Sequence, residues 1–253
     1  MDGVWLAALS GLIAGGTLLV GAAVAWFIDI PQRVVAGIMA LGAGVLISTL
    51  AFELVEEAAD IGGVLPTSVG FLAGAVLYIV ADWLVSRPSK HPKPRPANIA
   101  ARRAGANLAG GTGVAIAIGA LVDGIPESIV MGLSVLQGGI SIPIVAAIAI
   151  SNFPEGLGST AALKRSGSSA RSVFLLWGGI ALVTLVASVA GFVVFQSAPG
   201  HVVALITTIA AGGLLAMICN TMIPEAFEEQ RALTGLWATL GFLGAFLLHE
   251  VAG

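Results

Sequence analysis

Two Pro-Glu motifs stand in the middle of long apolar runs and supply the residues best suited to chemistry. They are Asp123-Gly-Ile-Pro-Glu127 and Ser151-Asn-Phe-Pro-Glu155. In each motif the Glu and the polar residue four positions earlier share one face of a helix. Ionisable groups at membrane depth are costly and indicate a functional site by default. The repeated pattern on consecutive segments predicts a polar site inside a helical bundle, with a cation as its natural occupant.

The two segments run in opposite directions, so their polar residues are expected to converge near the middle of the bundle. A proline inside a helix leaves one backbone carbonyl without its usual partner, and in lipid that carbonyl needs protein, water or an ion. Three carboxylates packed together would force protonation unless a divalent cation removed the repulsion. An alternative is that each Pro-Glu pair is only a kink with a hydrogen-bonded carboxyl. The predicted metal ligands are Asp123, Glu127, Ser151, Asn152 and Glu155.

The composition indicates that helices spanning a membrane must hold this site. The 253-residue chain is 57% hydrophobic and only 10% charged, whereas soluble proteins are about 25% charged. A helix needs roughly 20 apolar residues to cross a bilayer. We therefore predict one all-α, polytopic transmembrane domain over residues 1–253. Its eight transmembrane helices are expected at about 4–28, 34–55, 66–86, 112–137, 140–163, 172–196, 202–226 and 232–252.

The positive charges predict the orientation of these spans. All eleven Lys and Arg residues fall in or beside alternate connections. Because such residues mark the cytoplasmic side, both termini are predicted to lie outside. Segment 87–111 contains four prolines and six of the basic residues, which predicts a flexible cytoplasmic loop. Compact loops and the lack of a targeting segment favour the cytoplasmic membrane of a prokaryote.

Two further acidic groups lie nearer the ends of spans. Glu53 and Glu57 share a face near the outer end of the second span and are interpreted as a cation-attracting entrance. Thr221-Met-Ile-Pro-Glu225 repeats the central pattern near the cytoplasmic end of the seventh span. We interpret Glu225 and Glu228 as an exit. The alternative is that all of these acids are simply solvated ends of helices.

These residues resemble the ZIP (Zrt/Irt-like) family of divalent metal transporters. Residues 151–156, Ser-Asn-Phe-Pro-Glu-Gly, are similar to the family pattern His-Asn-x-Pro-Glu-Gly. Residues 53–58, Glu-Leu-Val-Glu-Glu-Ala, resemble the family's His-Leu-Leu-Pro-Glu-Ala. The resemblance implies an inverted repeat, with spans 1–3 related to spans 6–8 around the central spans 4 and 5. It also implies a homodimer and uptake of metal into the cytoplasm.

The chain departs from the family pattern at its expected ligands. Asp123 stands where the family usually has His, Gly124 replaces an Asn, and Ser151 replaces a His. The predicted site is therefore richer in oxygen, and oxygen ligands suit manganese, magnesium or calcium better than zinc. Zinc is the family expectation, with manganese, iron(II) or cadmium as alternatives, at one site rather than two. Met131, Met217 and Met222 offer soft sulfur ligands, although methionines in such segments more often only pack.

The leading functional prediction is transport of a divalent transition metal into the cytoplasm. The alternative is a non-transporting membrane protein of the same fold that acts as a metal sensor or regulatory partner. An enzyme is not expected, since the His-Glu-x-x-His zinc motif and the Gly-x-Ser-x-Gly nucleophile turn are both missing. The predicted partners are the metal ion and the lipid bilayer, with no cofactor and no nucleic acid.

Overall fold

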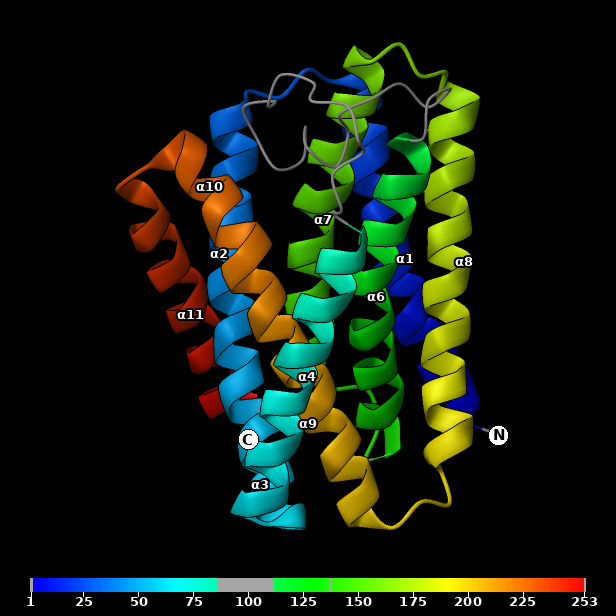
Figure 1. Ribbon diagram of the computed structural model, residues 1–253, viewed down its shortest axis with the longest axis vertical. Helices are drawn as coiled ribbons and strands as arrows, with labels where there is room; N and C mark the ends of the chain where they lie inside the picture. The colour runs from blue at the N-terminus through cyan, green and yellow to red at the C-terminus, as the bar shows by residue number, and fades with distance from the viewer. Residues whose placement is uncertain (1, 86–111, 137, 253) are drawn as a thin grey trace.

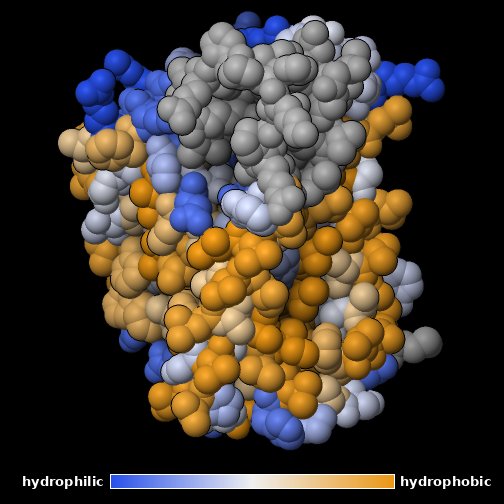
Figure 2. Space-filling view, viewed as in Figure 1, coloured by the Kyte–Doolittle hydropathy of each residue, from blue (hydrophilic) through white to orange (hydrophobic). Residues whose placement is uncertain are grey.

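The computed structural model describes residues 2–85, 112–136 and 138–252, and the predicted loop at 87–111 lies outside them. The described residues form helices joined by short connections, with no strand among them. Within the described residues, eight helical segments are long and apolar enough to cross a membrane, which confirms the prediction of an all-α fold with eight candidate spans. Apolar side chains cover much of the surface in Figure 2. These features suggest a multi-pass membrane protein.

Six spans are single helices and two are composite (Figure 1). The single helices are α1 (Asp2–Phe27), α4 (Val64–Val85), α6 (Thr112–Leu136), α7 (Ile142–Arg165), α8 (Ala170–Phe195) and α11 (Leu233–Ala252). The second span consists of α2 (Gln32–Thr49), the π-helical segment η1 (Leu50–Glu56) and α3 (Glu57–Gly62). The seventh consists of α9 (Gly200–Met217), the π-helical segment η3 (Ile218–Met222) and α10 (Ile223–Gln230).

The sequence-based ends of the two composite spans were too early. The second span was predicted to end near residue 55 and the seventh near 226, but they continue to Gly62 and Gln230. The predicted ends followed the apolar runs, yet a helix can continue into water with polar residues on its exposed side. Both helices instead end where the backbone turns to positive φ, at Gly63 (84°) and Arg231 (48°).

Glycines allow several helices to approach within backbone contact. A Cβ added to Gly21 of α1 would lie 2.2 Å from the carbonyl oxygen of Phe153 in α7. A Cβ added to Gly156 of α7 would lie 2.3 Å from the carbonyl oxygen of Leu18 in α1. Small residues of this kind are the usual means of packing helices in lipid, where no hydrophobic force favours association. They fix α7, which carries Ser151 and Glu155, closely against α1.

The two ends of the bundle differ in charge. Both chain termini lie at the lower end of Figure 1, where α3 also ends. The described Lys and Arg residues stand at helix ends on the opposite side: Arg33, Lys164, Arg165, Arg171 and Arg231. Lys164 forms an ion pair with Asp29 at 3.1 Å there. Such a one-sided distribution of Lys and Arg is the kind of pattern from which the orientation of a membrane protein is predicted.

Candidate functional site

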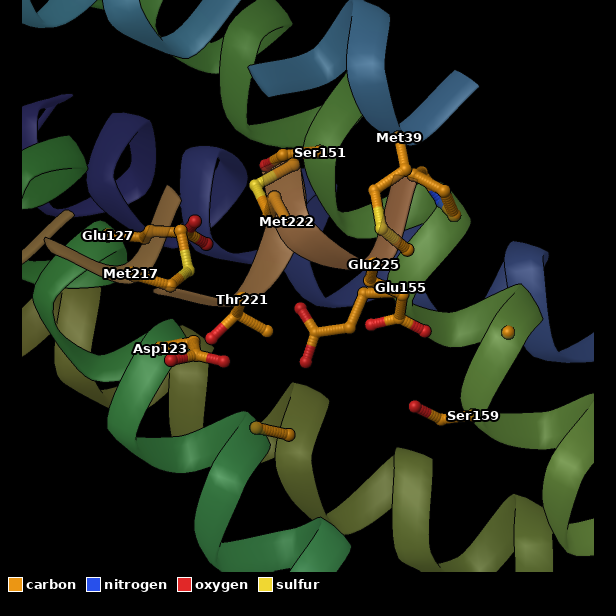
Figure 3. A pocket seen from close by; sticks show the side chains of 13 residues that line it. Met39, Asp123, Glu127, Ser151, Glu155, Ser159, Met217, Thr221, Met222 and Glu225 are labelled. Atoms are coloured by element: carbon orange, nitrogen blue, oxygen red, sulfur yellow. The ribbon is translucent and has the colours of Figure 1, made fainter. Parts of the chain in front are cut away.

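A cavity of about 50 Å³ lies among α2, α6, α7 and the composite seventh span. Its volume is enough for a few water molecules or one ion, given that a water needs roughly 10–15 Å³ measured in this way. Acidic, hydroxyl and methionine side chains form most of its wall (Figure 3). The described residues that line it are Met39, Ala120, Asp123, Glu127, Ser151, Pro154, Glu155, Gly158, Ser159, Met217, Thr221, Met222 and Glu225.

Four carboxyl groups from three spans meet at this cavity. Asp123 and Glu127 come from α6, Glu155 comes from α7, and Glu225 comes from α10. Asp123 and Glu127 are each only 3% exposed. Figure 3 shows Asp123, Glu155 and Glu225 directed toward a common space, with Glu127 farther to one side. The spacing of four residues within α6 and the opposite directions of α6 and α7 produce this convergence.

Asn152 supports the site from behind and does not line the cavity. Its Nδ2 donates to the carbonyl oxygen of Ala14 at 3.2 Å, and its side chain lies close enough to Glu127 to interact with that carboxyl group. Asn152 therefore connects a buried carboxyl group on α6 to the backbone of α1. Ser151, the neighbouring residue, does line the cavity, and its hydroxyl donates to the carbonyl of Ile148 at 2.9 Å. The sequence predicted both residues as metal ligands. In the structure, Ser151 lines the cavity and Asn152 does not.

The carbonyl groups that the two prolines leave without partners do not contribute to the wall. The helices α6 and α7 continue through Pro126 and Pro154. The carbonyl of Ile150, four residues before Pro154, faces α2, because a Cβ added to Gly42 would lie 3.3 Å from its oxygen. Neither Ile150 nor Val122 lines the cavity. The oxygen atoms available to an occupant are therefore mainly those of side chains.

The third Pro-Glu motif contributes to the same cavity. Thr221 and Glu225 both line it, and Thr221 shares a hydrogen bond of 3.3 Å with the hydroxyl of Tyr78 on α4. Thr221 lies in the π-helical segment η3, and such wide turns frequently occur at functional sites. Of the two predicted exit residues, Glu225 thus lies with the central carboxylates. Glu228 is exposed and does not line the cavity.

The predicted entrance residues stand at the end of the bundle that carries the termini. Glu53 accepts hydrogen bonds from the Ser141 hydroxyl at 3.2 Å and from Nδ1 of His249 at 2.7 Å. Ser141 is the N-cap of α7, and His249 lies near the end of α11. Glu57 lies close enough to Glu53 for their carboxylates to interact electrostatically. The partners of Glu53 are distant in sequence, so no local signal could have revealed them.

The acidic side chains around the cavity do not form a compact set of metal ligands. Across the described residues, no three His, Cys, Asp or Glu side chains are gathered tightly enough to hold a metal ion. Like charges on facing helices favour such separation, because each carboxylate raises the cost of ionising its neighbours. A cation bound among them would require movement of side chains or helices toward it.

No family model matches the chain, and no curated protein matches it. The interpretation of the cavity therefore depends on its own chemistry.

Sequence reasoning did not anticipate Met39, and it assigned Met217 and Met222 to packing. All three line the cavity. A signal was present for Met222, which lies within the third Pro-Glu motif. Met39 carries no such signal, because its place at the cavity depends on how α2 packs against α7.

Proposed function

We propose that this protein is a divalent metal transporter of the ZIP type, with its ion site at the cavity between α2, α6, α7 and α10. The observation that carries the proposal is the convergence of four carboxyl groups from three membrane-spanning segments on one cavity. Intramembrane acids are costly, and those that persist typically belong to ion pathways. The similarity of segments 53–58, 123–128 and 151–156 to the motifs of that family supports the same conclusion.

Electrostatics favours a divalent cation as the substrate. Two like charges about 4 Å apart repel by roughly 4 kcal/mol at an effective dielectric constant of about 20. A divalent cation replaces this repulsion with attraction to several carboxylates at once. Hydroxyl groups of Ser151, Ser159 and Thr221 add neutral oxygen ligands.

The helix packing supports an inverted repeat of spans 1–3 and 6–8. Four helix pairs are joined by reciprocal glycines that face carbonyl oxygens or backbone atoms of the partner. An inverted repeat makes spans 1, 2 and 3 equivalent to spans 6, 7 and 8, and span 4 equivalent to span 5. Under this correspondence the contact between α1 and α7 is equivalent to the contact between α8 and α6. The contact between α2 and α11 is likewise equivalent to the contact between α9 and α4. The glycine pairs are Gly21 and Gly156, Gly191 and Gly132, Gly44 and Gly241, and Gly212 and Gly74.

The two composite spans support the same symmetry. Both α2 and α9 are 18 residues long and are followed directly by a π-helical segment and a short α-helix. Gly44 and Gly212 occupy the same position, the thirteenth, in α2 and α9. Transporters built from inverted repeats bind their substrate near the midplane between the repeats. The cavity lies between α2 and the seventh span, as that arrangement requires.

In this proposal the basic end of the bundle faces the cytoplasm and the termini lie outside, according to the positive-inside rule. The ion enters past Glu53 and Glu57, binds among Asp123, Glu127 and Glu155, and leaves past Glu225 and then Glu228. The carboxylates of α6, α7 and α10 approach one another when the ion binds.

The proposal is tested by metal flux into proteoliposomes that contain the purified protein. Zn²⁺, Cd²⁺, Mn²⁺, Fe²⁺ and Mg²⁺ are compared in the wild type and in the double variant Glu127→Gln/Glu155→Gln. The matched control is Glu229→Gln, which changes an exposed acid outside the cavity. We expect the double variant to lose flux and the control to retain it. Equal flux in the wild type and the double variant would show that these carboxylates do not carry the ion.

A second candidate function is a metal sensor or regulatory protein that binds the ion without transporting it. It is favoured by the lack of histidine among the described cavity residues, since imidazole is the usual ligand for zinc. Calorimetric titration of the purified protein with each metal separates the two candidates. Binding that Glu127→Gln/Glu155→Gln abolishes, together with no flux for any metal, would favour the sensor.

A further inference from the structure

The apolar part of the cavity wall has an unusual composition. Among the described lining residues, the only large apolar side chains are methionines: Met39, Met217 and Met222. The whole chain contains five methionines, whereas leucine, isoleucine and valine are the more common large apolar residues of the surrounding core. A wall selected for packing alone would draw on those more abundant residues. The enrichment of methionine therefore calls for a chemical reason.

The three methionines come together from separate places in the chain. Met39 lies in α2, Met217 is the last residue of α9, and Met222 is the last residue of η3. Figure 3 shows them spread around the cavity, with Met217 beside Glu127, Met222 beside Ser151, and Met39 on the side of Glu155 and Glu225. All three are at most 7% exposed. An ion held by the carboxylates would thus lie in the same buried cavity as these thioether sulfurs, sheltered from lipid and water.

We propose that Met39, Met217 and Met222 supply thioether ligands that make the cavity select soft divalent cations such as Cd²⁺ over hard ones such as Mn²⁺. This inference rests on the proposed function, because it assumes that the same cavity receives the ion. Thioether sulfur is a soft ligand, whereas carboxylate and hydroxyl oxygens suit manganese and magnesium. The oxygen-rich motifs alone predict a hard site, and the methionine wall shifts that preference toward softer ions.

Methionine also fills irregular gaps because its side chain is flexible, so a purely packing role must be separated from ligation. Leucine has a similar volume and is generally well tolerated in place of methionine, but it lacks the sulfur. The test variant is therefore Met39→Leu/Met217→Leu/Met222→Leu. The control is Met131→Leu, because Met131 is fully buried in the same core but does not line the cavity.

The first measurement is the ratio of Cd²⁺ to Mn²⁺ uptake in proteoliposomes. We expect the triple variant to lower this ratio by about tenfold, the smaller end of the loss seen when a metal site loses a supporting partner. The Met131→Leu ratio should equal that of the wild type. A triple variant that transports both ions at the wild-type ratio would overturn the inference while leaving the proposed transport intact.

The second measurement is X-ray absorption at the cadmium edge on the purified protein loaded with Cd²⁺. Sulfur neighbours that disappear in the triple variant and persist in Met131→Leu are the expected result, whether or not the protein transports the ion. If the wild type moves neither ion, the transport proposal fails and this spectrum alone decides the inference. A shell of oxygen only, or no bound Cd²⁺, would overturn it.

Discussion

The close contact between α1 and α7 can be tested by the substitution Gly21→Ala. The new Cβ would lie 2.2 Å from the carbonyl oxygen of Phe153, whereas real Cβ contacts essentially never fall below 3.0 Å. The two helices must therefore separate locally by at least the difference, roughly 0.8 Å. The obstacle is backbone, which cannot rotate away as a side chain would. Overpacking of this kind typically costs about 1–3 kcal/mol of stability.

That cost corresponds to a fall in melting temperature of roughly 2–12 °C for a chain of this size. The assay is thermal unfolding in detergent, followed by tryptophan fluorescence. The matched control is Gly16→Ala on the same helix, where an added Cβ meets nothing within 4 Å. Alanine is the better helix former, so the control should melt at the wild-type temperature or slightly above.

The same variant should also weaken transport, because the contact positions Glu155 two residues beyond Phe153. No residue of α1 is among those that line the cavity, so any loss of flux must pass through a displacement of α7. A displacement near 1 Å can reduce the rate of a positioned reaction by about 100-fold. If Gly21→Ala and Gly16→Ala melt at the same temperature and transport equally, the glycine contact does not fix α7, and our account of the bundle is wrong.

Three further predictions concern the site and its outer end. Asn152→Leu removes the polar side chain that lies near Glu127 and donates to the backbone of α1. We expect metal affinity in calorimetric titration to fall about 10-fold, because loss of a residue that supports a metal ligand typically costs about 10- to 100-fold in affinity. Unchanged affinity would exclude this role. His249→Phe keeps an aromatic ring beside Phe52 but removes the hydrogen bond to Glu53. We expect the initial rate of metal flux to change while metal affinity at the central cavity stays the same. A change in affinity would contradict the separation between the entrance residues and the central cavity. Uptake should decrease as external pH falls below neutrality, because protons compete with the metal for carboxylates; a flat profile from pH 5 to 7 (roughly the range in which protons begin to compete) would count against carboxylate ligands.

Features that depend on neighbours along one helix could be predicted from the amino-acid sequence alone. Apolar length set the number of spans, since each must be long enough to cross a bilayer. Spacing placed Asp123 and Glu127 on one face of α6, because residues four apart lie on the same side of a helix. The alternation of short connections made α6 and α7 antiparallel, and this brought Glu155 toward Asp123. These properties need no knowledge of how distant helices pack.

Only the tertiary structure decided which distant residues share a space. In the folded chain, Met39 and Met217 line the same cavity, and His249 and Ser141 form hydrogen bonds with Glu53. Asn152 lies near Glu127 but does not line the cavity. The tertiary structure also placed Glu225 with the central acids, because the seventh span continues as a helix through η3 and α10. These positions depend on the separation and rotation of the helices. Backbone contacts at glycines such as Gly21 and Gly156 fix both quantities, and a pattern within one helix does not contain them.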